Sequence, residues 1–288
     1  MDRKPLLGVV GGSGLYAMEG LSNLESRQIR TPFGEPSSAV VLGDLDGRCV
    51  AFLARHGAGH VYTPSEVNYR ANIYALKALG VERVVGISAC GSLREDYAPG
   101  DIVIPDQLVD LTKGRARSFF GEGLVAHVSM PEPFCPDLSA RVLESVEQAG
   151  GKAHRGGTFV TIEGPRFSTR AESGLYRAWG MSIIGMTTSP EAFLAREAEM
   201  CYTVMAHVTD YDVWHVSEGP VTVDMVVRVL QANTALAQQA IARLLASLDE
   251  KRACSCGNAL ADALITRRDA IPRETREKLG LFVDKYLP

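Results

Sequence analysis

A glycine-rich segment near the N-terminus could bind an anion. Gly11-Gly12-Ser13-Gly14 directly follows an apolar run at residues 6–10, and its backbone N–H groups, with the hydroxyl of Ser13, could donate to a phosphate. The same residues also fit a plain tight turn. They match the loose dinucleotide-binding pattern too, but no apolar strand with a terminal acid follows about 20 residues later, so that match is weak.

A basic pair and three small residues follow other apolar runs and add donors for the same anion. Arg55 and His56 offer a permanently charged guanidinium fork and a titratable ring. Ser88 and Ala89 end one later run and Thr187 ends another, at positions where hydroxyls commonly cap local structure. For the basic pair, the alternative is a surface arginine beside a core histidine.

Two carboxylates, Asp210 and Asp212, follow the apolar run at residues 201–208. Ionised carboxylates are costly beside such a run unless they have partners. A purine edge supplies partners, because N7 accepts from a protonated carboxyl and an exocyclic amino group donates to an ionised one. Close acids tend to share a proton in this way. A helix-capping pair is the alternative interpretation.

Short β-branched runs alternate with helix-period segments, which predicts an α/β fold. The predicted strands lie at residues 6–10, 48–53, 83–88, 101–105, 157–162, 182–186 and 201–208. The predicted helices begin at residue 63 and span residues 137–148, 169–179, 190–199, 221–248 and 272–286, and the helix at 221–248 should be one long amphipathic helix. Ligands of open α/β sheets bind outside the carboxyl ends of the strands, so we expect the polar residues above to converge at one edge.

Composition favours one large globular domain. The 288 residues are 46% hydrophobic and 22% charged. The net charge of -4 supplies no basic field for nucleic acid or an anionic membrane. No run approaches the ~20 apolar residues of a membrane helix. We expect residues 1–248 to form the domain, residues 249–288 to form a helical extension of it, and the protein to be cytoplasmic with small-molecule partners.

The six cysteines lack the C-x-x-C pairs typical of zinc sites, so most are expected to be buried thiols. Cys254 and Cys256 are the exception. Two cysteines one residue apart could close a small, easily reduced disulfide, and two plain thiols are the alternative.

Seven segments, in order, resemble the methylthioadenosine phosphorylase branch of the trimeric purine nucleoside phosphorylase family. They are TPFG (31–34), FLARHG (52–57), VNYRAN (67–72), ACGSLR (89–94), VTIEGPRFS (160–168), MTTSPE (186–191) and TDYD (209–212). The resemblance runs from about residue 7 to residue 248. It implies a single-domain α/β fold with a central mixed sheet, assembled as a homotrimer or a pair of trimers.

The resemblance also implies an activity. It is the phosphorolysis of 5′-methylthioadenosine to adenine and 5-methylthioribose 1-phosphate, in purine and methionine salvage. Inorganic phosphate is the co-substrate, and no metal or organic cofactor is implied. The paired aspartates favour adenine, because related enzymes acting on 6-oxopurines carry asparagine in place of the first.

Roles for single residues follow from the same resemblance. The phosphate site would comprise Ser13, Arg55, His56, Ser88, Ala89 and Thr187. The purine site would comprise Phe167, Ser168, Asp210 and Asp212, with a protonated Asp210 donating to N7. The sugar and its 5′ group would contact Met186, Val223, Val226 and, from the adjacent subunit, His127.

Three residues depart from the family pattern. Ser13 and Ser88 replace threonine and keep the hydroxyl. Gly185 replaces an asparagine that lies beside the base in some members, so hydrogen bonds to the base there are expected to be fewer or to come from water.

Rival functions are weighed by the same residues. A nucleosidase that uses water would not need the anion site, and the two aspartates oppose specificity for 6-oxopurines. A dinucleotide-dependent oxidoreductase rests on the glycine loop alone, and a non-catalytic nucleoside sensor stays open.

Overall fold

The central sheet of the computed structural model is built around four parallel, buried strands. Residues 3–215 and 222–287 are described, with the backbone alone described for Ser13, Met225 and residues 230–232. The strands are β1 (Leu7–Gly11), β4 (Arg48–Ala54), β5 (Arg83–Ser92) and β11 (Cys201–Asp210). β1 runs parallel to β4 and β5, and β5 runs parallel to β11, so their carboxyl ends point the same way.

Seven further strands make the sheet mixed, as expected. β3 pairs antiparallel with β4, and β10 pairs antiparallel with β5. The sheet branches at β5, because its first part also pairs with β11, which leads on to β6 and β8. These strands are β2 (Ser22–Arg27), β3 (Val40–Leu45), β6 (Ile102–Ile104), β7 (Gln107–Asp110), β8 (Ala153–Arg155), β9 (Thr158–Thr161) and β10 (Ile183–Gly185).

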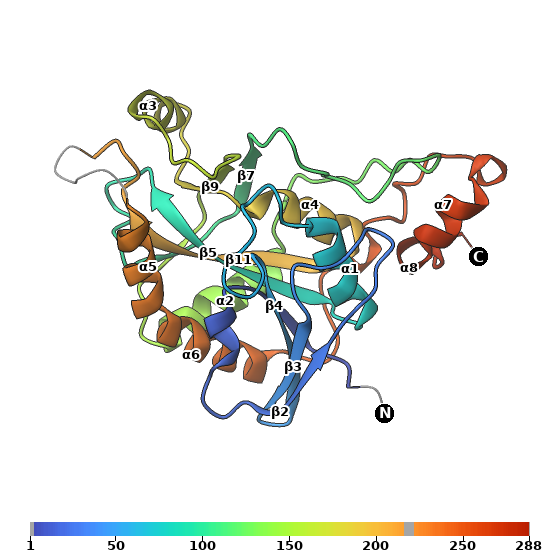
Figure 1. Ribbon diagram of the computed structural model, residues 1–288, viewed down its shortest axis with the longest axis horizontal. Coiled ribbons are helices and arrows are strands. Elements are labelled where there is room, and N and C mark those ends of the chain that lie inside the picture. Colours follow the sequence, from blue (N-terminus) through green and yellow to red (C-terminus); the bar gives the residue numbers. More distant parts are fainter. Residues whose placement is uncertain (1–2, 216–221, 288) are drawn as a thin grey trace.

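Helices cover both faces of this sheet (Figure 1). On one face α2 (Pro136–Gln148) packs against α6 (Thr234–Ser247), and Val142, Ile241 and Leu244 are fully buried there. On the other face α1 (Tyr69–Ala78) packs against α4 (Thr188–Glu197). The remaining helical elements are η1 (Ser13–Tyr16), α3 (Arg170–Ala178), α5 (Val223–Ala232), η2 (Ser255–Asn258), η3 (Arg268–Ala270), α7 (Arg273–Lys278) and α8 (Gly280–Val283). No helix of the described residues has both the length and the apolar character that a membrane span requires.

Three helix predictions are corrected by the structure. The helix expected from residue 63 begins at Tyr69, because Glu66 folds back onto Thr63 in a turn and Asn68 caps the helix by accepting from the N–H of Ala71 at 3.2 Å. The single helix expected over 221–248 is two helices, α5 and α6, which separate at Asn233. The last predicted helix is the pair α7 and α8, which separate at Leu279.

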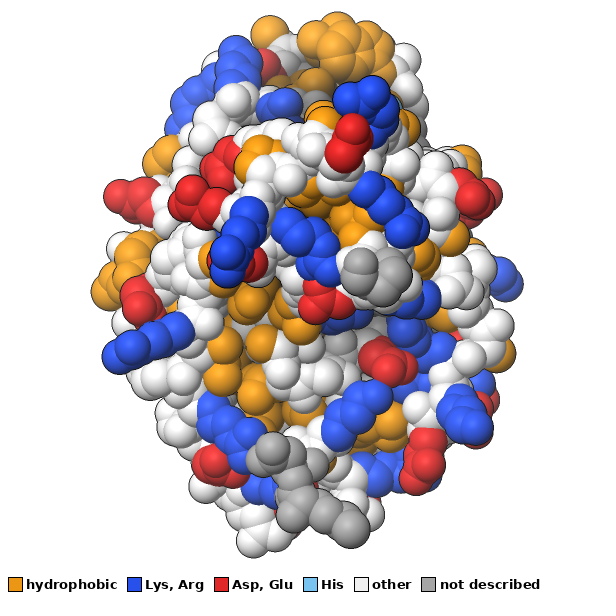
Figure 2. Space-filling view, turned by 90° about the vertical axis from the view of Figure 1, so that its right-hand side faces the viewer, with side chains coloured by type: hydrophobic (Ala, Val, Ile, Leu, Met, Phe, Trp, Pro, Cys, Tyr) orange, Lys and Arg blue, Asp and Glu red, His pale blue; other side chains and the backbone are white. Residues whose placement is uncertain are grey.

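The tail, residues 249–288, packs against the body of the molecule in its described part. Leu260, Leu279, Phe282 and Val283 are buried in the same apolar cluster as α1 and α4. Figure 2 shows acidic and basic side chains interspersed over one face of the molecule, with apolar side chains between them. The division at residue 248 stays a prediction.

Candidate active site

Arg55 stands directly after β4, and its side chain is buried beneath the carboxyl ends of β1 and β5. The guanidinium Nε donates to Oε1 of Glu191 at 2.5 Å and Nη2 donates to Oε2 at 3.0 Å. Nη1 donates to the carbonyl oxygen of Ile87 at 2.8 Å, and Nη2 also donates to that of Val10 at 3.1 Å. Burial disfavours the charge, but Glu191 keeps the pKa of Arg55 above its usual value. Glu191 thus occupies two of the three guanidinium nitrogens, and the role of Arg55 at an anion site stays a prediction.

The Arg55–Glu191 pair has tight surroundings that explain its place in the fold. The hydroxyl of Tyr202 on β11 donates to Oε2 of Glu191 at 2.8 Å. Gly86 on β5 faces the pair, and a Cβ there would lie 2.7 Å from the Tyr202 hydroxyl oxygen and 3.3 Å from Nη2 of Arg55. The pair thus ties β1, β4, β5, α4 and β11 together where their polar loops begin.

His56 adjoins Arg55 and is neutral near pH 7. Burial and the charge of Arg55 lower the pKa of His56 to about 4. Its Nδ1 lies 2.9 Å from the carbonyl oxygen of Tyr62, which fixes the proton on Nδ1. The ring therefore brings no positive charge near pH 7, and the phosphate-binding role of His56 stays a prediction.

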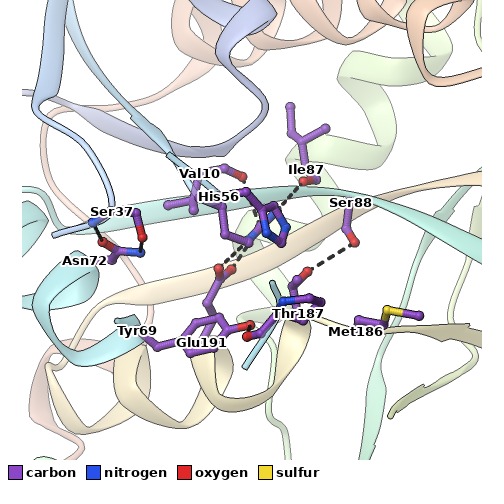
Figure 3. Close-up of polar contacts among 12 residues, drawn as sticks. Val10, Ser37, His56, Tyr69, Asn72, Ile87, Ser88, Met186, Thr187 and Glu191 are labelled. Atoms are coloured by element: carbon purple, nitrogen blue, oxygen red, sulfur yellow. Dashed lines mark hydrogen bonds and ion pairs between the residues drawn. The ribbon is translucent and has the colours of Figure 1, made fainter. Parts of the chain in front are cut away.

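The hydroxyls of Ser88 and Thr187 meet although 99 residues separate them in the chain. Their oxygen atoms lie 3.4 Å apart, and Ser88 also contacts the carbonyl oxygen of Ala89 at 3.0 Å (Figure 3). Both side chains are buried. The structure thus brings together Arg55, His56, Ser88, Ala89 and Thr187, while the Ser13 side chain lies outside the described residues.

Asp210 and Asp212 lie at the end of β11 and are both buried. Asp210 accepts hydrogen bonds from the Thr209 hydroxyl at 2.7 Å and from the Asp212 backbone N–H at 2.7 Å. Burial raises the pKa of Asp212, although the hydroxyls of Ser173 and Ser168 oppose this shift. Burial therefore favours a proton on Asp212, and donation to N7 by Asp210 stays a prediction.

Ser168 and Phe167 precede α3, whose first turn is fixed by a capping box. The Thr169 hydroxyl accepts from the Glu172 N–H at 3.2 Å, and the Glu172 carboxylate accepts from the Thr169 N–H at 2.7 Å. Ser168 faces Asp212, as its effect on that carboxyl indicates. The ring of Phe167 is 37% exposed, which leaves its face open to a partner.

Strand β5 passes both the hydroxyl pair and the carboxylates. Ser88 on this strand belongs to the hydroxyl pair. Gly91, three residues later, lies beside the carboxylates, because a Cβ at Gly91 would be 2.9 Å from Oδ1 of Asp210. A strand rises about 3.3 Å per residue, so about 10 Å separates the two ends. That length suits a ribose between an anion and a base.

Arg115 is a buried residue that the sequence did not single out. Its Nη1 donates to the carbonyl oxygens of Met186 at 2.5 Å and Ser189 at 2.8 Å, and its Nη2 donates to that of Glu163 at 2.7 Å. It therefore fixes the loop that carries Met186 and Thr187. In the sequence Arg115 lies in a Gly-Arg-Ala-Arg stretch that matches none of the motifs above, and Glu191 ends the segment MTTSPE without an assigned role.

The predicted wall for the 5′ group lies on α5, which packs against β11, and the predicted neighbour residue His127 lies in a loop. Val223 is 66% exposed and Val226 is half-buried, both on α5. His127 is exposed, and its backbone N–H donates to the carbonyl oxygen of Ala263 in the tail at 2.9 Å. The roles of these three residues stay predictions.

The space beside Gly185 on β10 is occupied by a neighbouring side chain. A Cβ there would lie 2.7 Å from the ring of Phe159, which is fully buried. An asparagine at this position would collide with that ring unless the ring moved, and the effect of Gly185 on hydrogen bonding to the base stays a prediction.

A cavity of about 710 Å³ lies between α3 and the residues that follow Asp212. It contains none of the predicted site residues. The Arg177 guanidinium stacks 3.3 Å above the centre of the Trp214 ring at its wall. Its lining residues are Arg170, Gly174, Arg177, Val213, Trp214 and His215.

Known proteins resemble this chain over nearly its whole length. The model of the phosphorylase superfamily matches residues 6–246. The S-methyl-5'-thioadenosine phosphorylase of Geobacter sulfurreducens is 52% identical over 283 residues, which cover 98% of this chain and 99% of that protein. That of Thermofilum pendens is 54% identical over 262 residues, covering 91% and 99%.

Solved structures agree with these relatives. A methylthioadenosine phosphorylase from an antarctic soil metagenomic library superposes with a TM-score of 0.93 at 48% identity, covering 97% of this chain and 99% of that one. The methylthioadenosine phosphorylase of Schistosoma mansoni in complex with adenine gives 0.84 at 36% identity, covering 90% and 96%. The chain therefore belongs to the phosphorylase superfamily, in the family of the S-methyl-5'-thioadenosine phosphorylases.

Proposed function

We propose that this chain is a pentosyltransferase that cleaves 5′-methylthioadenosine with inorganic phosphate, giving adenine and 5-methylthioribose 1-phosphate. One observation carries the proposal: buried hydroxyls and buried carboxylates lie beside two points of β5 about 10 Å apart, which leaves room for a ribose between an anion and a base. The names of the relatives, and the adenine bound by the Schistosoma mansoni protein, support the substrate.

In the anion site, Ser13, His56, Ser88, Ala89 and Thr187 donate to phosphate. Ser88 and Thr187 act through their hydroxyls, and the neutral ring of His56 leaves its backbone N–H as the donor. Arg55 contributes a fixed positive charge and holds the ends of β1 and β5 in place. Preorganised donors of this kind supply electrostatic stabilisation without rearrangement during the reaction.

In the purine site, Asp210 and Asp212 hold the N7 and amino edge of adenine, with Ser168 and Phe167 beside them. As the bond from the sugar carbon to the base breaks, positive charge builds on the ribose and negative charge on the purine. The protonated carboxyl of the pair gives its proton to N7, and phosphate oxygen forms the new bond to the sugar carbon. These steps require neither a metal nor an organic cofactor.

The remaining proposed contacts are those to the ribose and its 5′-methylthio group. Met186 contacts the ribose, Val223 and Val226 contact the 5′-methylthio group, and His127 reaches the site of an adjacent subunit. Exposed apolar residues on the segments near His127, Val125 at 41% and Ile265 at 60%, suit burial in a homotrimer or a pair of trimers. The protein would act in the cytoplasm, in purine and methionine salvage.

The direct test is release of free adenine from methylthioadenosine with and without phosphate, beside methylthioinosine. We expect phosphate-dependent adenine release and little hypoxanthine. Release without phosphate would indicate a nucleosidase, preference for methylthioinosine would contradict the roles of Asp210 and Asp212, and binding without turnover would indicate a sensor. Asp210→Asn should weaken adenine release far more than hypoxanthine release, whereas Asp262→Asn, at an exposed position, serves as the control.

A further inference from the structure

Four of the six cysteines form one cluster that the reaction does not use. The Sγ atoms of Cys135, Cys201, Cys254 and Cys256 all lie within 4.8 Å of one another. Cys135, Cys201 and Cys256 are buried, and Cys254 is half-buried. Spacing in the sequence does not reveal this group, because its members come from three distant stretches of chain.

Three different elements hold the four cysteines. Cys135 is the N-cap of α2, and Cys201 is the first residue of β11. Cys254 is the N-cap of η2 and Cys256 lies within η2, in the tail. A ligand shared by all four would therefore fasten the tail to the sheet and to α2.

The distances suit a tetrahedral metal site. Zinc holds four thiolates at about 2.3 Å each, which places neighbouring sulfur atoms about 3.8 Å apart. The separation of Cys201 Sγ from Cys254 Sγ is 3.2 Å, well beyond the ~2.05 Å of a disulfide. Every sulfur atom lies within 4.8 Å of the other three, whereas two disulfides require only two separate close pairs.

The charges around the cluster favour thiolates. Arg252 Nη1 lies 3.9 Å from Cys201 Sγ, and Arg196 Nη1 lies 3.9 Å from Cys256 Sγ. The N-cap position of Cys135 adds the positive end of a helix. Zinc with four thiolates carries a net charge of -2, which two guanidinium groups offset, whereas disulfides are neutral and need no cations. Arg252 also pairs with Glu82 at 3.0 Å, which uses part of its positive charge. Arg196 and the N-terminal end of α2 therefore offset the rest of the negative charge of the thiolates.

We propose that Cys135, Cys201, Cys254 and Cys256 bind one zinc ion in a closed, tetrahedral structural site that fastens the tail to the body of the molecule. All four positions are filled by the protein, so no position is left for water or substrate. Binding displaces the thiol protons to solvent, and no redox step is involved. The site is independent of the proposed phosphorolysis.

The first experiment measures metal in the full chain. The protein is produced in zinc-supplemented medium, purified without chelator, and analysed by inductively coupled plasma mass spectrometry. We expect about one zinc per chain. Cys254→Ser should lose most of it, and Cys49→Ser, which removes a cysteine outside the cluster, should keep it. Removing the metal should lower Tm while the thiols stay reduced.

A second measurement does not depend on whether a variant folds. The wild-type chain, stripped of metal under reducing conditions, is titrated with Co²⁺ and should show thiolate-to-cobalt charge-transfer bands with tetrahedral d–d bands, which zinc then abolishes. Two outcomes overturn the proposal. One is a metal-free protein whose intact mass and alkylation pattern show two disulfides in the cluster, and the other is four free thiols that bind neither ion.

Discussion

Arg55 and Glu191 form a buried ion pair on which the proposed anion site rests. The arginine was identifiable from the sequence, because it follows an apolar run beside His56. Its partner was not, because Glu191 lies 136 residues later in the chain and no local pattern connects the two. The sequence therefore predicted which residues gather at the strand ends, but not that Arg55 would be engaged by another protein group.

Glu191→Gln should be strongly destabilising. It leaves the Arg55 guanidinium buried without its counter-charge, a change that typically costs about 3–5 kcal/mol. Urea unfolding measures the loss, and the KM for phosphate should rise in the folded fraction, because the ends of β1 and β5 lose their anchor. Glu250→Gln, at an exposed position, should change stability by no more than about 0.5 kcal/mol. Equal stability of the two variants would contradict the role given to the pair.

His207 on β11 should make the folded state sensitive to acid. Its ring is 1% exposed, and neither ring nitrogen has a partner among the described residues. Burial lowers its pKa to about 4. The unfolded chain, with a usual pKa of about 6.5, binds the proton more readily, so stability is lost as pH falls from about 6.5 towards 4.

The size of this effect is about 3 kcal/mol over the whole window. Urea unfolding at pH 7 and near pH 4.5 measures it. His207→Leu should lack this part of the pH dependence, whereas His60→Asn, at an exposed histidine, should retain it. An unchanged pH dependence in His207→Leu would assign the acid sensitivity to other groups.

Among the elements, the buried parallel strands were predictable and the edge strands were not. β1, β4 and β11 read as continuous apolar runs because both of their faces are covered. β2 was missed because its residues are polar and largely exposed, as an edge strand permits. The break at Asn233 was missed because α5 and α6 continue one apolar pattern through it.

Thr169→Ala should loosen the start of α3. The change removes the hydroxyl of the capping box, which is typically worth about 1 kcal/mol. Because Phe167 and Ser168 directly precede this cap, the KM for the nucleoside should rise about two-fold or more while the KM for phosphate stays unchanged. Steady-state kinetics with each substrate varied separately checks this, and Thr169→Ser should restore the wild-type values. A parallel rise in both constants would point to general loosening of the fold.

At the scale of the whole molecule, the tail contributes to the main apolar core. Phe282 is 4% exposed, and its ring lies 4.4 Å from that of Phe119 and 5.6 Å from that of Tyr74. The sequence predicted residues 249–288 only as a helical extension of the domain, because charged residues separate the few apolar ones that turn inward. Which of them turn inward depends on surfaces that the body of the fold supplies.

Phe282→Ala should therefore destabilise the whole protein by about 3–5 kcal/mol. Leu281→Ala is a matched control, because that neighbouring side chain is 39% exposed. Its cost should stay near 0.5 kcal/mol. Thermal and urea unfolding of the two variants distinguish a tail that shares the core from one that merely lies on it, for which both changes would be mild.

The long separation between Arg55 and Glu191 has a consequence for how the chain is made. During synthesis, residues 1–190 can emerge and collapse without forming the anion site, because the carboxylate that anchors Arg55 has not yet left the ribosome. At the proposed site, a phosphate ion would recognise only chains whose two halves have already met. Ligands that bind the native state alone stabilise it by mass action. The co-substrate of the reaction would then act as a pharmacological chaperone, drawing late folding intermediates towards the active form.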